Sequence, residues 1–398
     1  MDSPASTLSP PHQARDVSEA IGRFLAEPLD LASLELIEVI VPQVEGFRSA
    51  LGVRNERRAL LARVREGSGA WGIGECSCRP DPWFNGEFVE GSRAVLRDFV
   101  APLLPGVDSV GSLLTAVERV RSWPFTRAVL LDAVADLVRR RSGRDLLDGW
   151  SGQRVDRVPV GISLGLFPSP EAAVDRVARA VTDGYHRVKL KISPTMDFEP
   201  LAEVRRSFPE VHLGFDANGS CGDEDLPFLE RLASLGPTTL EQPFAPDRLD
   251  LAAELRRREL GFRLCLDESV SSLGQLRSAV GLGALDELNL KPGRVGGPVE
   301  TFRILAEAQG LGLPVWVGGM FETGIGRFAN LRVARRLPSA QAHDLSPSSR
   351  YFTVDLLERP LEMDAQGTID LGGEAPPALD DGILQELTQH HERLDLTV

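Results

Sequence analysis

From about residue 158, the chain repeats one unit, a short apolar run followed by a longer stretch with helical periodicity. Such runs predict buried strands, and the stretches between them predict helices packed on those strands. Eight strands that alternate with helices favour a parallel barrel over an open doubly wound sheet, because no G-x-G-x-x-G motif follows the first strand. The predicted strands are 158–164, 187–192, 211–215, 238–240, 263–266, 287–290, 314–317 and 341–345, and the predicted helices are 171–182, 225–235, 250–258, 273–282, 299–309 and 326–335.

The part of the chain before this repeat has a different pattern. A polar tail leads into a short amphipathic helix around residues 17–26. Apolar stretches rich in β-branched residues then predict strands at 38–41, 59–64 and 71–75, and helical periodicity follows in 92–103, 110–121 and 127–140. The sequence therefore predicts a smaller β-rich unit in front of one large α/β unit.

Charge and hydropathy limit the possible partners. The net charge of -14 argues against nucleic acid and anionic membranes. The sequence contains no apolar run of transmembrane length, and its first residues lack the basic and apolar regions of a signal peptide. We therefore expect a soluble cytoplasmic protein that binds neither nucleic acid nor membrane.

Three consecutive predicted strands end in an acidic residue. These residues are Asp216, Glu241 and Asp267, and they are separated by 25 and 26 residues. Successive strands of a barrel are neighbours, so the three carboxylates should converge at the C-terminal rim, where barrel active sites lie. Three converging carboxylates repel one another unless a cation lies between them. Oxygen ligands of this kind suggest Mg²⁺, with Mn²⁺ as the second choice.

Only three of the 44 basic residues are lysines, namely Lys189, Lys191 and Lys291. Arginine replaces lysine in surface roles but cannot give up its proton near neutral pH, so the remaining lysines are candidates for proton chemistry. Lys191 precedes Asp216 by 25 residues and Lys291 follows Asp267 by 24, which predicts one lysine on each side of the metal. Lys189 should face the same way as Lys191 and lower its pKa. A neutral amine there could remove a proton next to a metal-bound carboxylate.

Together, these residues are similar to the enolase superfamily and its muconate lactonizing enzyme subgroup, from about Glu35 to Tyr351. The resemblance implies an α/β fold, a modified TIM barrel of the (β/α)₇β type with an N-terminal α+β capping domain. The motifs that carry it are Lys189-Leu190-Lys191, Asp216-Ala217-Asn218, Glu241-Gln242-Pro243, Asp267-Glu268-Ser269 and Lys291-Pro292-Gly293.

The resemblance also implies domain limits and residue roles. The limits are an extension over 1–34, the capping domain over 35–150, the barrel over 151–350, and a segment over 351–398 that packs back on the capping domain. Mg²⁺ would be held by the three acids, and the acid/base pair would be Lys191 and Lys291. Lys189 and Asn218 would support them.

Within the subgroup, the chain most resembles o-succinylbenzoate synthases and N-succinylamino acid (N-acylamino acid) racemases. The resembling segments are 291–297, 317–326 and 344–346. Ser163 and Gly319 match positions that hold the succinyl part of the substrate, and Met320 lies beside Gly319. An arginine at position 294 is similar to the branch that contains racemases and bifunctional enzymes. The two glycines Gly318 and Gly319 let backbone N–H groups approach an oxyanion.

The resemblance implies a small carboxylate substrate, a homo-oligomer, and one of two reactions. The first is a dehydration that yields o-succinylbenzoate for menaquinone synthesis, and the second is racemisation of N-acylated amino acids. The sequence permits either reaction or both, and it favours dipeptide epimerase and muconate cycloisomerase less. A Schiff-base barrel and a non-catalytic binding protein are further alternatives, but the first leaves the three acids without a role and the second does not require lysine rather than arginine.

Overall fold

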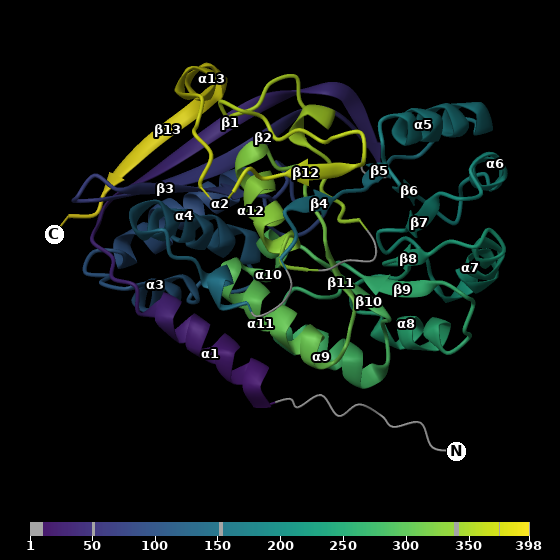
Figure 1. The fold of residues 1–398 in the computed structure, drawn as a ribbon, viewed down its shortest axis with the longest axis horizontal. Coiled ribbons are helices and arrows are strands. Elements are labelled where there is room, and N and C mark those ends of the chain that lie inside the picture. The colour runs from purple at the N-terminus through teal and green to yellow at the C-terminus, as the bar shows by residue number, and fades with distance from the viewer. Residues whose placement is uncertain (1–10, 50–51, 151–153, 338–341, 374, 398) are drawn as a thin grey trace.

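The structure is a computed structural model that describes residues 11–49, 52–150, 154–337, 342–373 and 375–397. Two bodies are visible in Figure 1, an antiparallel sheet with its helices and a barrel of parallel strands. No helix in the described ranges is long and apolar enough to cross a membrane.

The capping sheet joins strands from both ends of the chain. Its order is β13-β1-β2-β3, and every neighbouring pair is antiparallel. The predicted strands 38–41 and 59–64 are the middle parts of β1 and β2, which extend much further as a long hairpin. The strands are β1 (Leu31–Ser49), β2 (Gly52–Glu66), β3 (Trp71–Cys76) and β13 (Thr388–Asp395).

Helix α4 (Pro124–Ser142) lies directly against β3. Most of its residues are buried, which explains why it has no polar face along much of its length. The other helical segments of this region are α2 (Val89–Val95), the π-helical η1 (Leu96–Val100), the 3₁₀ turns η2 (Ala101–Leu103) and η3 (Leu146–Gly149), and α3 (Val110–Val117).

We expect Gly72→Ala to lower the free energy of unfolding by about 2–3 kcal/mol. A Cβ atom at Gly72 would lie 2.2 Å from both the Ala133 carbonyl oxygen and the Leu137 nitrogen of α4. Because both atoms belong to the helix backbone, the methyl group fits only if α4 separates from β3. Urea denaturation followed by circular dichroism measures the change. The control is Gly281→Ala, where a Cβ atom would meet nothing within 4 Å; equal midpoints for the two variants would contradict the prediction.

Helix α1 (Pro11–Leu25) connects the two bodies. Its residues contact α3 and η3 on the capping side and α11 (Pro298–Gly310) on the barrel side. The buried side chains Ala20, Ile21 and Phe24 form the contact face. Figure 1 shows this helix lying across the lower edge of the molecule.

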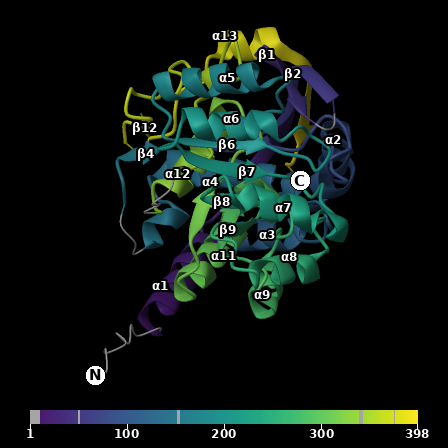
Figure 2. The same ribbon diagram turned by 90° about the vertical axis from the view of Figure 1, so that its right-hand side faces the viewer.

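Seven parallel strands form the barrel wall in the order of the chain, from β5 to β11. Helices pack on its outer surface, and five of them, α5 to α9, face the viewer in Figure 2. The strands are β5 (Ile162–Leu164), β6 (Arg187–Lys191), β7 (His212–Asp216), β8 (Thr239–Glu241), β9 (Arg263–Leu266), β10 (Glu287–Leu290) and β11 (Val315–Val317). The further helices are α5 (Pro170–Thr182), α6 (Glu199–Ser207), α7 (Leu226–Ala233), α8 (Leu249–Arg256), α9 (Leu273–Leu282), α10 (Pro292–Val295), α12 (Gly324–Ala334) and α13 (Asp381–Leu387).

Two predicted strands differ from the structure. The run 158–164 is not one strand, because β4 (Arg157–Pro159) pairs with β12 (Thr368–Asp370) and only β5 joins the barrel. The predicted strand 341–345 is reduced to isolated bridges, and Gln341 lies outside the described residues.

Those bridges nevertheless close the barrel. His343 bridges to Val160 beside β5, and Asp344 bridges to Gly318 beyond β11. The Gly161 nitrogen donates to the His343 carbonyl at 2.7 Å, and the Asp344 nitrogen donates to the Val317 carbonyl at 2.9 Å. This two-residue segment therefore occupies the position of the eighth strand. The predicted (β/α)₇β barrel with an α+β cap is confirmed.

Candidate active site

The carboxyl ends of β6 to β10 bring the predicted acids and lysines together. Parallel pairing sets Lys191 beside Asp216, and Asp216 beside Glu241. Asp267 follows the last residue of β9, and Lys291 follows the last residue of β10. The order around the rim is therefore lysine, three acids and lysine, as parallel neighbouring strands require.

Each lysine contacts at least one of these acids. Lys191 Nζ lies 2.6 Å from Asp216 Oδ2, and Lys291 Nζ lies 2.7 Å from Asp267 Oδ2. Lys189 Nζ lies 2.7 Å from Glu241 Oε2 and 3.4 Å from Asp216 Oδ2. The three acids are at most 1% exposed, so these contacts are shielded from solvent.

The negative charges of neighbouring carboxylates also disfavour ionisation within the cluster. Burial raises the pKa of Glu241 to about 7, and the Asp216 and Asp267 charges add to the rise while Lys189 opposes it. Burial acts the same way on Asp216, but the Lys191 and Lys189 ammonium groups outweigh it and lower its pKa. Three buried carboxylates at adjacent strand ends thus form a site whose ionised state requires positive charge nearby.

The donor set fits a divalent metal ion. All three side chains supply hard oxygen ligands, and Asp267 Oδ1 accepts no hydrogen bond although Arg294 Nη2 lies 3.1 Å away. With each of the three carboxylates in contact with a lysine, no group of three acidic, histidine or cysteine side chains among the described residues is arranged around a metal position. In this structure the lysine ammonium groups neutralise the carboxylates.

Asn218 connects Lys191 to a further acid. Its Oδ1 accepts a hydrogen bond from Lys191 Nζ, and its Nδ2 donates to Glu268 Oε1 at 2.9 Å. Its backbone has a φ of 45°, in the left-handed region that asparagine adopts more readily than most residues, and its nitrogen donates to Asp216 Oδ1 at 3.0 Å. Asn218 is thus held at both ends of its amide.

Two acids near the site had no role in the sequence analysis. Glu268 Oε2 is buried without a hydrogen-bond partner, and burial with the Asp267 charge raises the pKa of Glu268. Asp344 Oδ2 lies 2.8 Å from Lys189 Nζ and belongs to the segment that closes the barrel. The position of Glu268 directly after Asp267 was a usable signal, whereas Asp344 lies within the predicted strand 341–345, which the structure reduces to bridges.

A cavity of about 350 Å³ opens above this rim, a size suited to a small-molecule substrate. Its floor includes Lys189, Lys191, Asp216 and Lys291. Part of its wall comes from the capping domain, through Gln43, Glu56, Arg57, Arg79, Pro80, Trp83 and Phe84.

The predicted substrate-binding residues are placed in two ways. Ser163, Gly319 and Met320 line the cavity. Arg294 is not part of its lining; it is buried behind the rim, near Asp267 Oδ1 and 3.8 Å from Met320 Sδ. Its guanidinium lies over the Phe84 ring at 5.3 Å, so it contacts the wall from behind.

Comparison with known proteins places this geometry in a family context. The model of the Enolase C-terminal domain-like family matches residues 172–373. An N-succinylamino acid racemase of Thermus thermophilus is 38% identical over 336 residues, which cover 84% of this chain and 90% of the racemase. An o-succinylbenzoate synthase of Enterococcus faecalis is 35% identical over 343 residues, covering 86% of this chain and 93% of the synthase.

The fold has solved counterparts as well. A structure described as a member of the Enolase superfamily from Listeria innocua superposes with a TM-score of 0.86 at 27% identity. The superposition covers 93% of this chain and 100% of that chain. The similarity therefore includes the capping domain in addition to the barrel.

Proposed function

Because the chain belongs to the enolase superfamily, we propose that it abstracts the proton α to a carboxylate and acts as an o-succinylbenzoate synthase. It is an enzyme, and its relatives include both lyases and isomerases. The observation that carries the proposal is the pair Lys191 and Lys291, which lies on the two sides of the acid cluster and lines one cavity. The alternative is an N-succinylamino acid racemase, which requires the same two lysines.

Related enzymes of the enolase superfamily generally use a divalent metal ion. In this chain, Asp216, Glu241 and Asp267 would hold it, and we propose Mg²⁺, with Mn²⁺ as a substitute. When bound, such an ion supplies Lewis-acid stabilisation of the negative charge that a substrate carboxylate gains as the α-proton leaves.

Lys191 is the proposed base in the dehydration. Its amine takes the α-proton, and the resulting ammonium delivers that proton to the departing hydroxide on the same face, so water leaves and the base is restored. Asp216 and Asn218 fix the position of Lys191 Nζ. Lys291 stays protonated in this reaction and stabilises negative charge across the cavity.

In the racemisation, both lysines exchange protons. One lysine removes the α-proton from one face, and the other donates a proton to the opposite face. Both of them contact an acid of the cluster, as the geometry above describes. The proposed placement of the acyl end is against Ser163, Gly319 and Met320, which line the same cavity.

A paired assay tests the proposal. Purified enzyme with Mg²⁺ is given the cyclohexadiene precursor of o-succinylbenzoate in one arm and N-succinylamino acids in D₂O in the other. We expect dehydration in the first arm. Exchange of the α-proton without dehydration would favour the racemase, and activity in both arms would identify a bifunctional enzyme. Inactivity in both arms would overturn the substrate assignment.

A further inference from the structure

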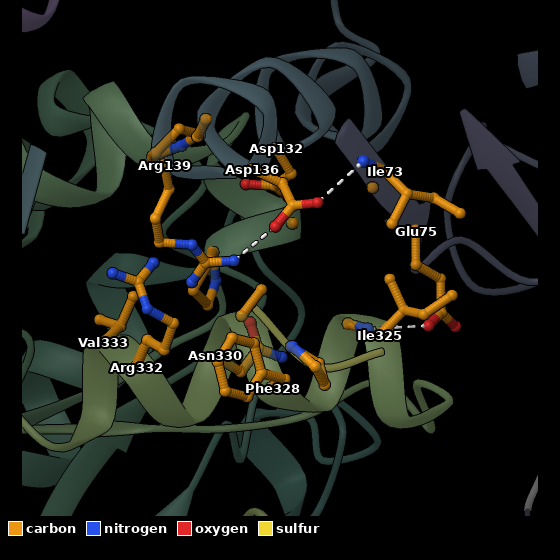
Figure 3. A pocket seen from close by; sticks show the side chains of 18 of the residues that line it. Ile73, Glu75, Asp132, Asp136, Arg139, Ile325, Phe328, Asn330, Arg332 and Val333 are labelled. Carbon is orange, nitrogen blue, oxygen red and sulfur yellow. Dashed lines mark hydrogen bonds and ion pairs between the residues drawn. The ribbon is translucent and has the colours of Figure 1, made fainter. Parts of the chain in front are cut away.

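Glu75 of the capping domain performs the N-terminal capping of a barrel helix. It lies in β3, is 4% exposed, and points at the first turn of α12 (Figure 3). Its carboxylate accepts hydrogen bonds from the Thr323 nitrogen at 3.0 and 3.1 Å, the Thr323 hydroxyl at 2.7 Å and the Gly326 nitrogen at 3.1 Å. Thr323 is the residue before the helix, yet its own side chain makes no capping bond. The first turn of a helix needs such acceptors, and here another domain supplies them.

We propose that Glu75 is a positioning residue that holds the turn Gly318–Phe321, and with it the acyl end of the substrate, through the start of α12. The part of this inference that concerns the acyl end rests on the proposed function. The part that concerns the turn rests on the contacts alone.

The side chain of Glu322 connects the turn to the first part of α12. Glu322 Oε1 accepts a hydrogen bond from the Met320 nitrogen at 2.8 Å, and its Oε2 lies 3.2 Å from Arg327 Nη2 of α12. Between them, Phe321 has a φ of 63°, a strained value that must be held by its surroundings. Gly319, Met320 and Phe321 line the cavity. A shift at the first turn of α12 therefore moves the cavity wall.

The position of Glu75 is costly for a carboxylate. Within the described residues, no lysine or arginine forms an ion pair with it, and its partners are N–H and O–H groups at a helix N-terminus. Burial raises the pKa of Glu75, the Arg57 charge opposes the rise, and the Glu322 charge adds to it. A carboxylate kept under these conditions is expected to serve the helix it caps.

A second carboxylate keeps the helix in place when Glu75 is altered. Asp355 Oδ1 accepts a hydrogen bond from the Gly324 nitrogen at 3.0 Å. We therefore expect Glu75→Gln to fold, while an NH₂ group now faces backbone donors and loosens the turn. The chemistry at Lys191 and Lys291 lies on other strands, so binding should change more than turnover.

The closing experiment compares Glu75→Gln with Asp136→Asn. Glu75 and Asp136 both line a second pocket, which lies between β3, α4 and α12 (Figure 3). Asp136 accepts a hydrogen bond from the Ile73 nitrogen at 3.1 Å, and its ion pairs are with Arg139 and Arg140 of α4 and not with α12. In Glu75→Gln, we expect backbone amides of residues 318–322 to exchange hydrogen at least about tenfold faster, with KM raised about tenfold and kcat changed less than about threefold. Asp136→Asn should leave the exchange and both constants near those of the parent enzyme.

The two claims fail separately. Unchanged amide exchange at residues 318–322 in Glu75→Gln overturns the positioning role, whatever the substrate. Faster exchange with an unchanged KM overturns the link to the acyl end. If the parent enzyme turns over neither substrate class, the proposed function fails while amide exchange still decides the positioning claim. Should Glu75→Gln not fold, Thr323→Val removes only the hydroxyl donor. If the amides of residues 318–322 exchange at the same rate in Thr323→Val as in the parent enzyme, the proposal is overturned as well.

Discussion

Replacement of Lys191 by arginine is expected to lower dehydration and α-proton exchange by about 10³- to 10⁴-fold. Arginine stays protonated near neutral pH, so it keeps the positive charge beside Asp216 but cannot accept the α-proton. Lys191 Nζ lies 2.6 Å from Asp216 Oδ2, and that contact can be made by a guanidinium as well. The loss would therefore report on proton transfer and leave the charge balance of the acid cluster intact.

Lys291→Arg is the matched control for this experiment, because its expected result depends on the reaction. In the dehydration, Lys291 contributes only its charge, and arginine retains most of that contribution. In the racemisation, Lys291 must exchange a proton, so the loss should match that of Lys191→Arg. The measurement is deuterium incorporation from D₂O into each enantiomer, run beside the dehydration assay. Activity of Lys191→Arg within about tenfold of the parent enzyme would eliminate Lys191 as the base.

Removal of divalent metal ions by a chelator is expected to abolish activity, and added Mg²⁺ or Mn²⁺ is expected to restore it. The fold should survive this treatment, because lysine ammonium groups neutralise the same carboxylates in the structure. Titration calorimetry on the stripped enzyme measures the affinity for Mg²⁺, and circular dichroism checks the fold. Full activity after exhaustive chelation would refute a metal-dependent reaction.

Variants separate metal binding from general damage to the barrel. Asp267→Asn should weaken Mg²⁺ binding by at least about tenfold, because an anionic ligand becomes neutral. Glu287→Gln is the matched control. Glu287 is an equally buried carboxylate of β10, but it accepts the Thr239 hydroxyl at 2.7 Å and pairs with Arg263 at 3.1 Å. The Glu287→Gln variant should lose stability and keep its affinity for Mg²⁺. Equal Mg²⁺ affinities of Asp267→Asn and Glu287→Gln would contradict the assignment of Asp267.

The barrel was predictable from the sequence because its strands are buried on both faces. The runs 187–192, 263–266 and 287–290 differ from β6, β9 and β10 by at most one residue. The split between β4 and β5 was missed because periodicity gives the existence of an extended run but not its partner, and β4 pairs with a strand of the C-terminal segment. Helix α6 was missed as well, although its first turn contains a proline and an acid, which favour helix starts.

The floor of the candidate site could be predicted, whereas its wall could not. Strand ends of a barrel meet at one rim, so Asp216 and Glu241 were bound to be neighbours once their strands were found. Gln43, Glu56 and Arg57 reach the cavity from β1 and β2, and which residues of a strand face a cavity of another domain depends on tertiary packing. Contacts such as Glu75 with Thr323 join residues that are 248 positions apart, and one sequence contains no local signal for them.

The pairing of β13 with β1 gives the protein an unusual order of assembly during translation. β1 leaves the ribosome before any barrel strand, but β13, its neighbour in the sheet, emerges only after the whole barrel has been made. Until then, one edge of β1 has unpaired N–H and C=O groups, which invite association with other nascent chains. The first sheet to be synthesised is thus the last to be completed. We expect chaperones that shield exposed strand edges to raise the yield of folded enzyme without changing its free energy of unfolding.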